Sequence, residues 1–219
     1  MEKTRINNKW PVAREGIPFF LFGVLASSIL FITGLLLPGF IMVFLSLFAL
    51  YFFRDPERRA LADEKTVLAP ADGKILEIRK FEDNENPLGM PAVKLSIFMS
   101  LFNVHVNRVP VHGKITKIEY NPGKFFSANL DKASEYNEKN LITLLANCDH
   151  RIVLIQIAGL IARRIVCWVK ETDYVKSGQR LGLIRFGSRL DIYIPENSQI
   201  TVQKYQKVKA GETILGYLS

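Results

Sequence analysis

The chain has 219 residues, a length that suits one domain plus a small extra module. Its formal net charge of +8 and pI near 9.5 indicate an anionic partner, either a nucleic acid or a membrane surface. We expect no nucleic-acid partner, because the sequence has no zinc-finger pattern, aromatic RNA-binding motif or long basic tract. The uncharged run from Ile17 to Phe53 favours a membrane instead.

The N-terminal third has the pattern of a membrane segment. Ile17–Leu36 is apolar and long enough to span a bilayer, since a spanning helix needs about 20 residues. Leu37-Pro38-Gly39 is expected to break this helix. The second apolar stretch, Phe40–Phe53, covers roughly 21 Å of a hydrocarbon core about 30 Å thick. The pair predicts a helical hairpin, or a wedge that enters and leaves one leaflet.

Basic residues flank both ends of this segment, which predicts that both ends lie in the cytoplasm. They are Lys3, Arg5, Lys9 and Arg14 before it, and Arg54, Arg58 and Arg59 after it. A signal peptide fits poorly, because the run is too long and lacks a small-residue cleavage site. A hairpin buried in a soluble core is the other alternative. We expect residues 1–59 to anchor the chain in the cell membrane and residues 60–219 to face the cytoplasm.

After Arg59 the pattern changes to short strands rich in Val, Ile and Leu, separated by turn residues. This predicts a mostly β domain, a small folded sheet or a barrel-like structure. The expected strands are Lys74–Arg79, Ala92–Phe98, Lys114–Tyr120, Leu141–Ala146, Ile152–Ala158, Ile165–Val169, Arg180–Arg185, Asp191–Ile194 and Ile200–Gln203. The segment Leu160–Arg164 fits a helical turn, and Asn121–Asn140 fits either a covering loop or a surface loop.

Two internal repeats are visible. Asp72-Gly-Lys-Ile resembles His112-Gly-Lys-Ile, and Val175-Lys-Ser-Gly resembles Val208-Lys-Ala-Gly. Each predicts a turn that enters a strand. The second pair is similar to lipoyl-type domains, so a membrane-tethered binding module without catalysis is an alternative function. Lipoyl-type domains carry a modified lysine at a hairpin tip, and no such lysine lies between the two repeats.

The two cysteines, Cys148 and Cys167, have neither metal-binding nor redox spacing, so we expect reduced thiols and no metal site.

The stretch Arg185-Phe-Gly-Ser-Arg-Leu-Asp191 is the most informative one. Alone, its Gly-Ser pair indicates only a turn, because the stretch lacks the GxSxG of a hydrolase and the glycines of a phosphate loop. In company with five other segments, it resembles the processing site of the short bacterial and archaeal branch of phosphatidylserine decarboxylases. The other segments are Phe53-Arg-Asp-Pro-Glu-Arg58, Ala69-Pro-Ala-Asp-Gly-Lys74, Phe98-Met-Ser-Leu-Phe-Asn-Val-His-Val-Asn-Arg-Val-Pro110, Gln156-Ile-Ala-Gly-Leu-Ile-Ala-Arg-Arg-Ile-Val-Cys167 and Gly178-Gln-Arg-Leu-Gly182.

The resemblance implies a proenzyme that cuts itself between Gly187 and Ser188 into two chains, β and α. In this family the serine hydroxyl attacks the preceding carbonyl, which glycine leaves unobstructed. The new N-terminus becomes a covalent pyruvoyl group, the cofactor, formed from Ser188. That group forms a Schiff base with phosphatidylserine and acts as the electron sink for its decarboxylation to phosphatidylethanolamine.

Two other substrates stay open at this point. A related ether-linked serine lipid would make the chain an archaetidylserine decarboxylase. A soluble amino acid fits less well, because a soluble substrate needs no membrane anchor. The implied partners are the phospholipid and the membrane, and the oligomeric state, including a homo-oligomer, is left open.

The resemblance also implies His105 as the base that activates the serine, with Asp72 orienting the imidazole. The longer branch of the family carries two histidines three residues apart, whereas this chain has His105 and then Arg108. Two alternatives therefore stay open. His105 alone serves both self-cleavage and decarboxylation, or His112 takes a share of the work.

Arginine binds phosphate through paired hydrogen bonds, so arginines in the matched segments are candidates for the substrate phosphate. They are Arg108, Arg163, Arg164 and Arg189. Solvated surface charge is the alternative for each.

Overall fold

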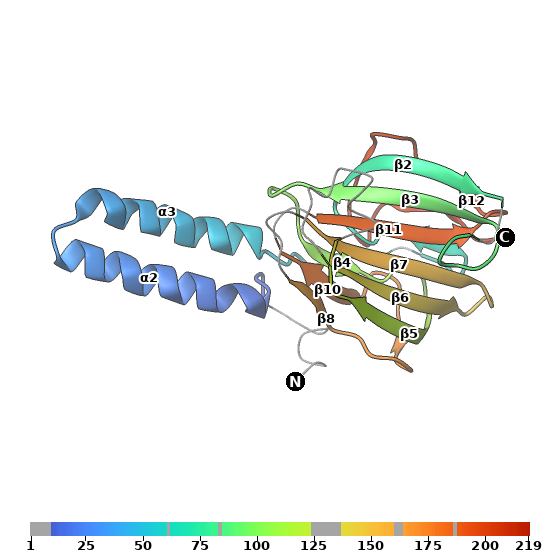
Figure 1. Ribbon diagram of the computed structural model, residues 1–219, viewed down its shortest axis with the longest axis horizontal. Coiled ribbons are helices and arrows are strands. Elements are labelled where there is room, and N and C mark those ends of the chain that lie inside the picture. The colour runs from blue at the N-terminus through green and yellow to red at the C-terminus, as the bar shows by residue number, and fades with distance from the viewer. Residues whose placement is uncertain (1–9, 61, 83–84, 124–136, 160–163, 186–187) are drawn as a thin grey trace. The chain divides into compact units, whose positions relative to one another are not determined.

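The computed structural model describes residues 10–60, 62–82, 85–123, 137–159, 164–185 and 188–219. Its internal contacts divide it into two compact units, one ending at Glu57 and the other covering Arg58–Ser219. The first unit is helical and the second is built of strands (Figure 1). This confirms the predicted fold class, a mostly β fold preceded by an apolar helical hairpin.

The helical unit is a hairpin of α2 (Ile17–Ile32) and α3 (Leu36–Phe52), preceded by the short 3₁₀ helix η1 (Arg14–Gly16). The predicted break at residues 37–39 is wrong: the chain turns at Thr33–Leu35, where Gly34 has a left-handed φ of 77°. Pro38 lies in the first turn of α3 instead. A proline is tolerated there because the first amide groups of a helix have no intrahelical acceptor.

Small residues line most of the contact between the two helices, where the Phe31 ring also packs on Gly39, and most of the large apolar residues point away from it. Gly23 and Ser27 in α2, with Gly39 and Ser46 in α3, are buried. A Cβ atom on Gly23 would lie only 1.9 Å from Ser46 Oγ, so the helices approach too closely there for any side chain. Phenylalanine, leucine and isoleucine side chains cover the outside. Small residues inside and large ones outside are typical of helix pairs in lipid.

By length and composition, the helical stretch Arg14–Ile32 is able to cross a membrane, and Leu36–Phe52 is a shorter apolar helix. This supports the predicted membrane association of the hairpin.

The second unit contains an eight-stranded antiparallel sheet that curls, in the order β13-β2-β3-β11-β7-β6-β5-β9 (Figure 1). Two three-stranded sheets, β1-β14-β12 and β4-β10-β8, accompany it. The strands are β1 (Thr66–Leu68), β2 (Gly73–Phe81), β3 (Ala92–Met99), β4 (Val106–Arg108), β5 (Gly113–Asn121), β6 (Lys139–Ala146), β7 (Arg151–Ala158), β8 (Ile165–Cys167), β9 (Tyr174–Val175), β10 (Arg180–Ile184), β11 (Ser188–Pro195), β12 (Gln199–Ile200), β13 (Lys207–Val208) and β14 (Ile214–Tyr217).

One face of the large sheet forms the main core, with Leu95, Ile97, Leu154, Leu190 and Ile192 among its fully buried members. Because side chains alternate along a strand, the residues between them point to the other face. A smaller apolar cluster, which includes Val153, Ile155 and Tyr193, lies on that other face.

The predicted repeats occupy equivalent positions in this sheet. β2 and β5 both have an irregular register two residues after their first glycine, between Ile75 and Glu77 and between Ile115 and Lys117. The matched turn glycines also share a left-handed backbone, with φ of 74° at Gly178 and 71° at Gly211.

The hydrogen bonds around the two repeats are reciprocal as well. Leu68 N–H donates to Pro110 O at 2.9 Å, and Arg108 N–H donates to Pro70 O at 2.8 Å. The strand order is therefore symmetric about the pair β11 and β7, with β13-β2-β3 on one side and β9-β5-β6 on the other.

Two differences from the expected strands affect the site. The strand expected at Asp191–Ile194 begins at Ser188, so the serine is a strand residue and not part of a turn. The short strand β4, directly after His105, was not expected from the sequence. Residues 160–163 of the expected helical turn Leu160–Arg164, and most of the loop Asn121–Asn140, lie outside the described residues.

Candidate active site

Ser188 is the first residue of β11 and is held from both sides. Its ladder partners are Met99, the last residue of β3, and Ala158, the last residue of β7. The side chain has no exposed surface, and its hydroxyl donates to the Met99 sulfur at 3.8 Å. A hydroxyl in this position is shielded from water and fixed in direction. Gly187, the other half of the predicted cleavage site, lies outside the described residues.

A chain of buried amides leads to the same methionine. Asn140 donates to Gln156 Oε1 at 3.0 Å, and Gln156 donates to Asn107 Oδ1 at 2.8 Å. Asn107 in turn donates to the Met99 sulfur at 3.6 Å. The Met99 thioether thus accepts from Asn107 and from Ser188, so the amide chain helps to set the position of the serine.

Sequence reasoning missed this amide chain. One signal was available: Gln156 interrupts an otherwise apolar strand, Ile-Val-Leu-Ile-Gln-Ile-Ala, and a buried amide needs partners. Which partners it meets depends on the pairing of strands that are distant in sequence.

His105 lies between the Ser100–Asn103 turn and β4 and is only 2% exposed. Its Nδ1 lies 2.9 Å from the carbonyl oxygen of Asn103. Because a carbonyl oxygen only accepts, Nδ1 carries the proton, and in the neutral ring Nε2 is then the nitrogen able to accept one. The turn itself is fixed by Asn103 Oδ1, which accepts from the Ser100 amide at 2.9 Å and hydroxyl at 2.8 Å.

Asp72 immediately precedes β2 and is also buried. Its Oδ1 accepts from the Ala210 amide at 2.8 Å, and its Oδ2 pairs with the Arg58 guanidinium at 3.0 Å. Both oxygens are thus engaged by groups other than the imidazole, and the predicted orientation of His105 by Asp72 stays a prediction.

His112 occupies the position of Asp72 in the other repeat. Its Nδ1 accepts from the Ser177 amide at 3.4 Å, as Asp72 accepts from Ala210. The repeat therefore gives His112 a role in holding its own turn, and a share of His112 in catalysis stays an open alternative.

The three predicted catalytic residues lie at the same end of the large sheet. β3 ends at Met99 where β11 begins at Ser188. The chain leaves β3 through the Ser100–Asn103 turn and reaches His105 two residues later. β2 starts beside this end, since Lys74 pairs with Phe98, and Asp72 directly precedes it.

The predicted phosphate arginines are placed very differently from one another. Arg189 is 2% exposed and donates to Asp191 at 2.6 Å and to Ser96 at 2.9 Å. Arg108 is 4% exposed and donates to the Gly178 carbonyl at 2.8 Å. These interior contacts hold strands and turns together. Arg164 is exposed, and Arg163 lies outside the described residues.

A cavity of about 550 Å³ opens at this end of the sheet. We call it the lysine cavity, because three of its lining residues are Lys74, Lys207 and Lys209. Its other lining residues are Asp72, Gly73, Phe98, Ser100, Phe102, Asn103 and Val208. It therefore borders Asp72, and it borders Asn103, whose carbonyl oxygen accepts from His105 Nδ1.

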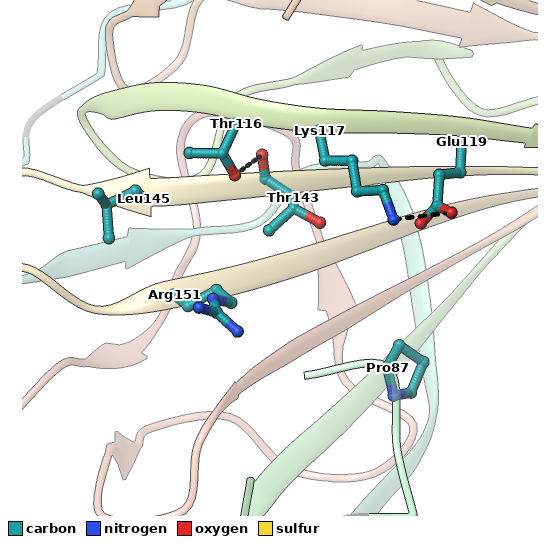
Figure 2. Close-up of a pocket in the computed structure, with 7 residues that line it drawn as sticks. All are labelled: Pro87, Thr116, Lys117, Glu119, Thr143, Leu145 and Arg151. Atoms are coloured by element: carbon teal, nitrogen blue, oxygen red, sulfur yellow. Dashed lines mark hydrogen bonds and ion pairs between the residues drawn. The ribbon is translucent and has the colours of Figure 1, made fainter. Parts of the chain in front are cut away.

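A second cavity, of about 460 Å³, lies over β5, β6 and β7 (Figure 2). Its lysine and glutamate, Lys117 and Glu119, pair with each other at 2.9 Å. Among the described residues, its lining contains none of the predicted site residues. The lysine cavity is therefore the better candidate for a substrate.

Comparison with known proteins shows the family of the chain. The family model described as phosphatidylserine decarboxylase matches residues 45–216. A phosphatidylserine decarboxylase proenzyme of Syntrophus aciditrophicus is 51% identical over 206 residues, which cover 94% of this chain and 96% of the relative. The proenzyme of Desulfotalea psychrophila is 49% identical over 208 residues, 95% of this chain and 97% of the relative. The chain belongs to the phosphatidylserine decarboxylase family.

Proposed function

We propose that this chain is a proenzyme that cuts itself between Gly187 and Ser188 and then converts phosphatidylserine to phosphatidylethanolamine. The observation that carries the proposal is the position of Ser188. The family's Gly-Ser pair ends in a fully buried serine at the head of a central strand, on the same sheet end as His105 and Asp72.

Self-cleavage begins with the Ser188 hydroxyl. Its oxygen attacks the Gly187 carbonyl carbon, the C–N bond between the two residues breaks, and the chain is then joined through an ester. A base has to remove the hydroxyl proton, and His105 Nε2 is the proposed acceptor. Elimination of the Gly187 carboxylate cuts the chain, and water then replaces the nitrogen of residue 188, which leaves as ammonia. The products are residues 1–187 and 188–219.

The pyruvoyl group so formed would supply a carbonyl that withdraws electrons from the substrate while CO₂ leaves. The buried surroundings of residue 188 fit such a group, because they exclude water from a reactive ketone. The protein's part is then to deliver a proton to the carbon that lost CO₂. We assign this step to His105, whose Nδ1–H is anchored on Asn103 O so that Nε2 keeps a fixed direction.

The apolar hairpin supports a lipid as the substrate. We propose that α2 and α3 hold the enzyme in the cell membrane with the sheet unit on the cytoplasmic side, where a phospholipid headgroup can reach residue 188. The basic flanks of the hairpin support this orientation.

The intact mass of the purified protein tests the proposal. Wild type should give two chains, the smaller with about one seventh of the 24.9 kDa mass and with a blocked N-terminus. Ser188→Ala should stay whole and inactive, since alanine has no hydroxyl to attack. Ser188→Cys is the matched control, because a thiol can form the corresponding thioester and should still cut. Wild-type protein that decarboxylates phosphatidylserine while intact at residue 188 would rule the mechanism out.

A further inference from the structure

Two lysines of the lysine cavity face each other across a strand pair. Lys207 in β13 and Lys74 in β2 are direct partners in the antiparallel ladder. Directly opposite residues share one face of a sheet, with Cβ atoms about 5 Å apart, and like charges in such a pair are destabilising. Both side chains are exposed and line the cavity. An anion bound between them would convert this repulsion into attraction.

The surroundings keep the positive charge in excess. Asp72 is neutralised by Arg58 at 3.0 Å, and Glu212 lies 3.6 Å from Arg58 and 3.9 Å from Lys209. Counting the three cavity lysines with Arg58 against these two carboxylates leaves two positive charges. Lys74 also packs over the Tyr205 ring at 4.7 Å, which fixes its direction but neutralises no charge.

The rim of the cavity is partly apolar. Phe102 is 67% exposed at the tip of the turn that leads to His105, and Phe98 lies on the wall. A free inorganic anion would gain nothing from exposed aromatic surface. A phospholipid offers both a phosphate for the lysines and an apolar part for the phenylalanine.

The distance to the reacting residue suits one headgroup. β2 and β11 both flank β3, and neighbouring strands lie about 4.8 Å apart, so Lys74 and Ser188 are separated by roughly 10 Å between backbones. Lys74 pairs with Phe98 on the outer face of the sheet, whereas Ser188 pairs with Met99 on the core face. A serine phospholipid that reaches both residues therefore passes around the sheet end, where Asp72 and Asn103 line the cavity.

We propose that Lys74 and Lys207 bind the phosphodiester of the serine phospholipid itself, with Lys209 adding positive charge at the rim. This assignment rests on the proposed decarboxylase function and names the phosphate subsite of that same active site. It differs from the arginine assignment made from the sequence, because Arg108 and Arg189 are buried and bonded within the sheet unit.

The other repeat provides a matched control. Lys114 follows Gly113 as Lys74 follows Gly73, and it packs near the Tyr174 ring at 5.6 Å as Lys74 packs over Tyr205. Its ladder partner in β9 is Tyr174, however, so no second lysine faces it there. Lys114→Gln removes the same charge from the equivalent position in β5, in the other half of the strand order.

The experiment uses full-length, self-cut enzyme and a short-chain phosphatidylserine kept below its micelle concentration, so that no lipid surface is present. A charged hydrogen bond contributes about 1.5–3 kcal/mol, which corresponds to a factor of at least ten in binding. Lys74→Gln and Lys207→Gln should therefore each raise KM about tenfold or more. kcat should stay within about twofold, and Lys114→Gln should behave as wild type. The extent of self-cleavage should be equal in all four proteins, since the cut involves no lipid.

A second arm uses vesicles of phosphatidylcholine, with and without phosphatidylglycerol, that contain long-chain phosphatidylserine. A KM defect present in both lipid mixtures supports the assignment. Wild-type KM values for monomeric substrate in both lysine variants would overturn it, as would a defect seen only in the phosphatidylglycerol vesicles, which would indicate general surface charge. Wild-type enzyme that cuts normally but leaves phosphatidylserine unchanged would instead refute the proposed function, and this assignment with it.

Discussion

His105 Nε2 is the atom on which the proposed proton transfers depend, because Nδ1 is committed to the Asn103 carbonyl. We expect His105→Ala to slow decarboxylation by about 10²–10⁴-fold, the usual range for loss of a general acid or base. Self-cleavage should slow as well. Single-turnover decarboxylation and the fraction of cut chain over time measure the two effects separately.

The matched control for that variant is His112→Asn. In the repeat, His112 holds its turn by accepting from the Ser177 amide, and an asparagine oxygen can accept the same bond. We expect near wild-type turnover together with a small change in thermal stability. Equal losses of activity in the two histidine variants would instead show that both take part in the reaction.

Asn107 tests the buried amide chain. Replacing it with leucine, which has a similar volume, leaves Gln156 without its acceptor and Met99 without one donor. An unsatisfied buried amide costs about 1–3 kcal/mol, so the melting temperature should fall. We also expect slower cutting, because the Met99 sulfur that accepts from Ser188 is no longer fixed.

Asn140→Leu is the comparison for Asn107, because Asn140 lies at the far end of the same chain, bonded to Gln156. It should lower stability without slowing the cut. A common loss of stability with unchanged cutting in both variants would mean that the chain serves the fold alone.

At the scale of the strands, an ion network ties β2, β3 and β11 together. Lys94 bonds Glu77 at 2.8 Å, and Arg189 lies 3.9 Å from the same oxygen. Partial burial acts to raise the pKa of the Glu77 carboxyl, but the hydrogen bond and charge of Lys94, with the charge of Arg189, outweigh it, and the pKa lies below its ordinary value. Folding therefore favours the ionised form of this group.

A depressed carboxyl pKa gives stability that is present above the ordinary value, about 4.3, and is lost as the pH falls through the lower folded value. Glu77→Gln in the Ser188→Ala background should thus lower the urea midpoint at pH 7. Because Glu77 is partly exposed, the difference should stay under about 1 kcal/mol. It should shrink when the pH is lowered to about 3. A gap that is constant across this range would contradict the ionic origin.

Element by element, the longer strands were predictable from their β-branched residues and turn boundaries. β4 was not predicted, because its three residues, Val-Asn-Arg, are too few to show an alternation of apolar and polar side chains. The start of β11 was not predicted for a different reason, because Gly-Ser is a turn signal. Only the pairing with Met99 and Ala158 makes Ser188 a strand residue. In the hairpin, Pro38-Gly39 outweighed Gly34 as a break signal, although proline is compatible with a first helical turn.

The residues of the site likewise include some that the sequence predicted and some that it did not. Ser188, His105 and Asp72 came from a family resemblance carried by contiguous segments. The amide chain and the facing lysines could not be predicted from the sequence, because each depends on the register between strands that are far apart in sequence. Lys74 and Lys207 are separated by most of the domain, and only the β13–β2 ladder makes them neighbours.

Gly23 tests the helix pair as a packing unit. A side chain there would collide with Ser46, so Gly23→Leu should force α2 and α3 apart at a cost of about 1–3 kcal/mol. The measurement is the yield of a disulfide between cysteines placed on the two helices, in detergent micelles. Val24→Leu, at a position 42% exposed on the outside of the same helix, should leave that yield unchanged.

For the whole molecule, the hairpin and its charges predict on which side of the membrane the two ends lie. The chain reverses at Thr33–Leu35, so the residues before α2 and after α3 emerge on one side of any membrane that the hairpin enters. Arg14 precedes α2 and Arg54 follows α3, and further basic residues lie beyond each. Since basic flanks are retained in the cytoplasm, both ends of the protein should be cytoplasmic.

Protease protection in sealed vesicles of defined orientation tests this arrangement, with one epitope tag at the N-terminus and another after Ser219. Both tags should be digested in inside-out vesicles, and both should be protected in right-side-out vesicles. A useful comparison replaces the basic residues that precede α2 with glutamine, which weakens the charge signal on one flank only and should reduce the fraction of correctly oriented chains. Finding the two tags of the wild-type protein on opposite sides would show that α2 crosses the membrane and α3 does not return, and the hairpin could not then be the membrane anchor proposed here.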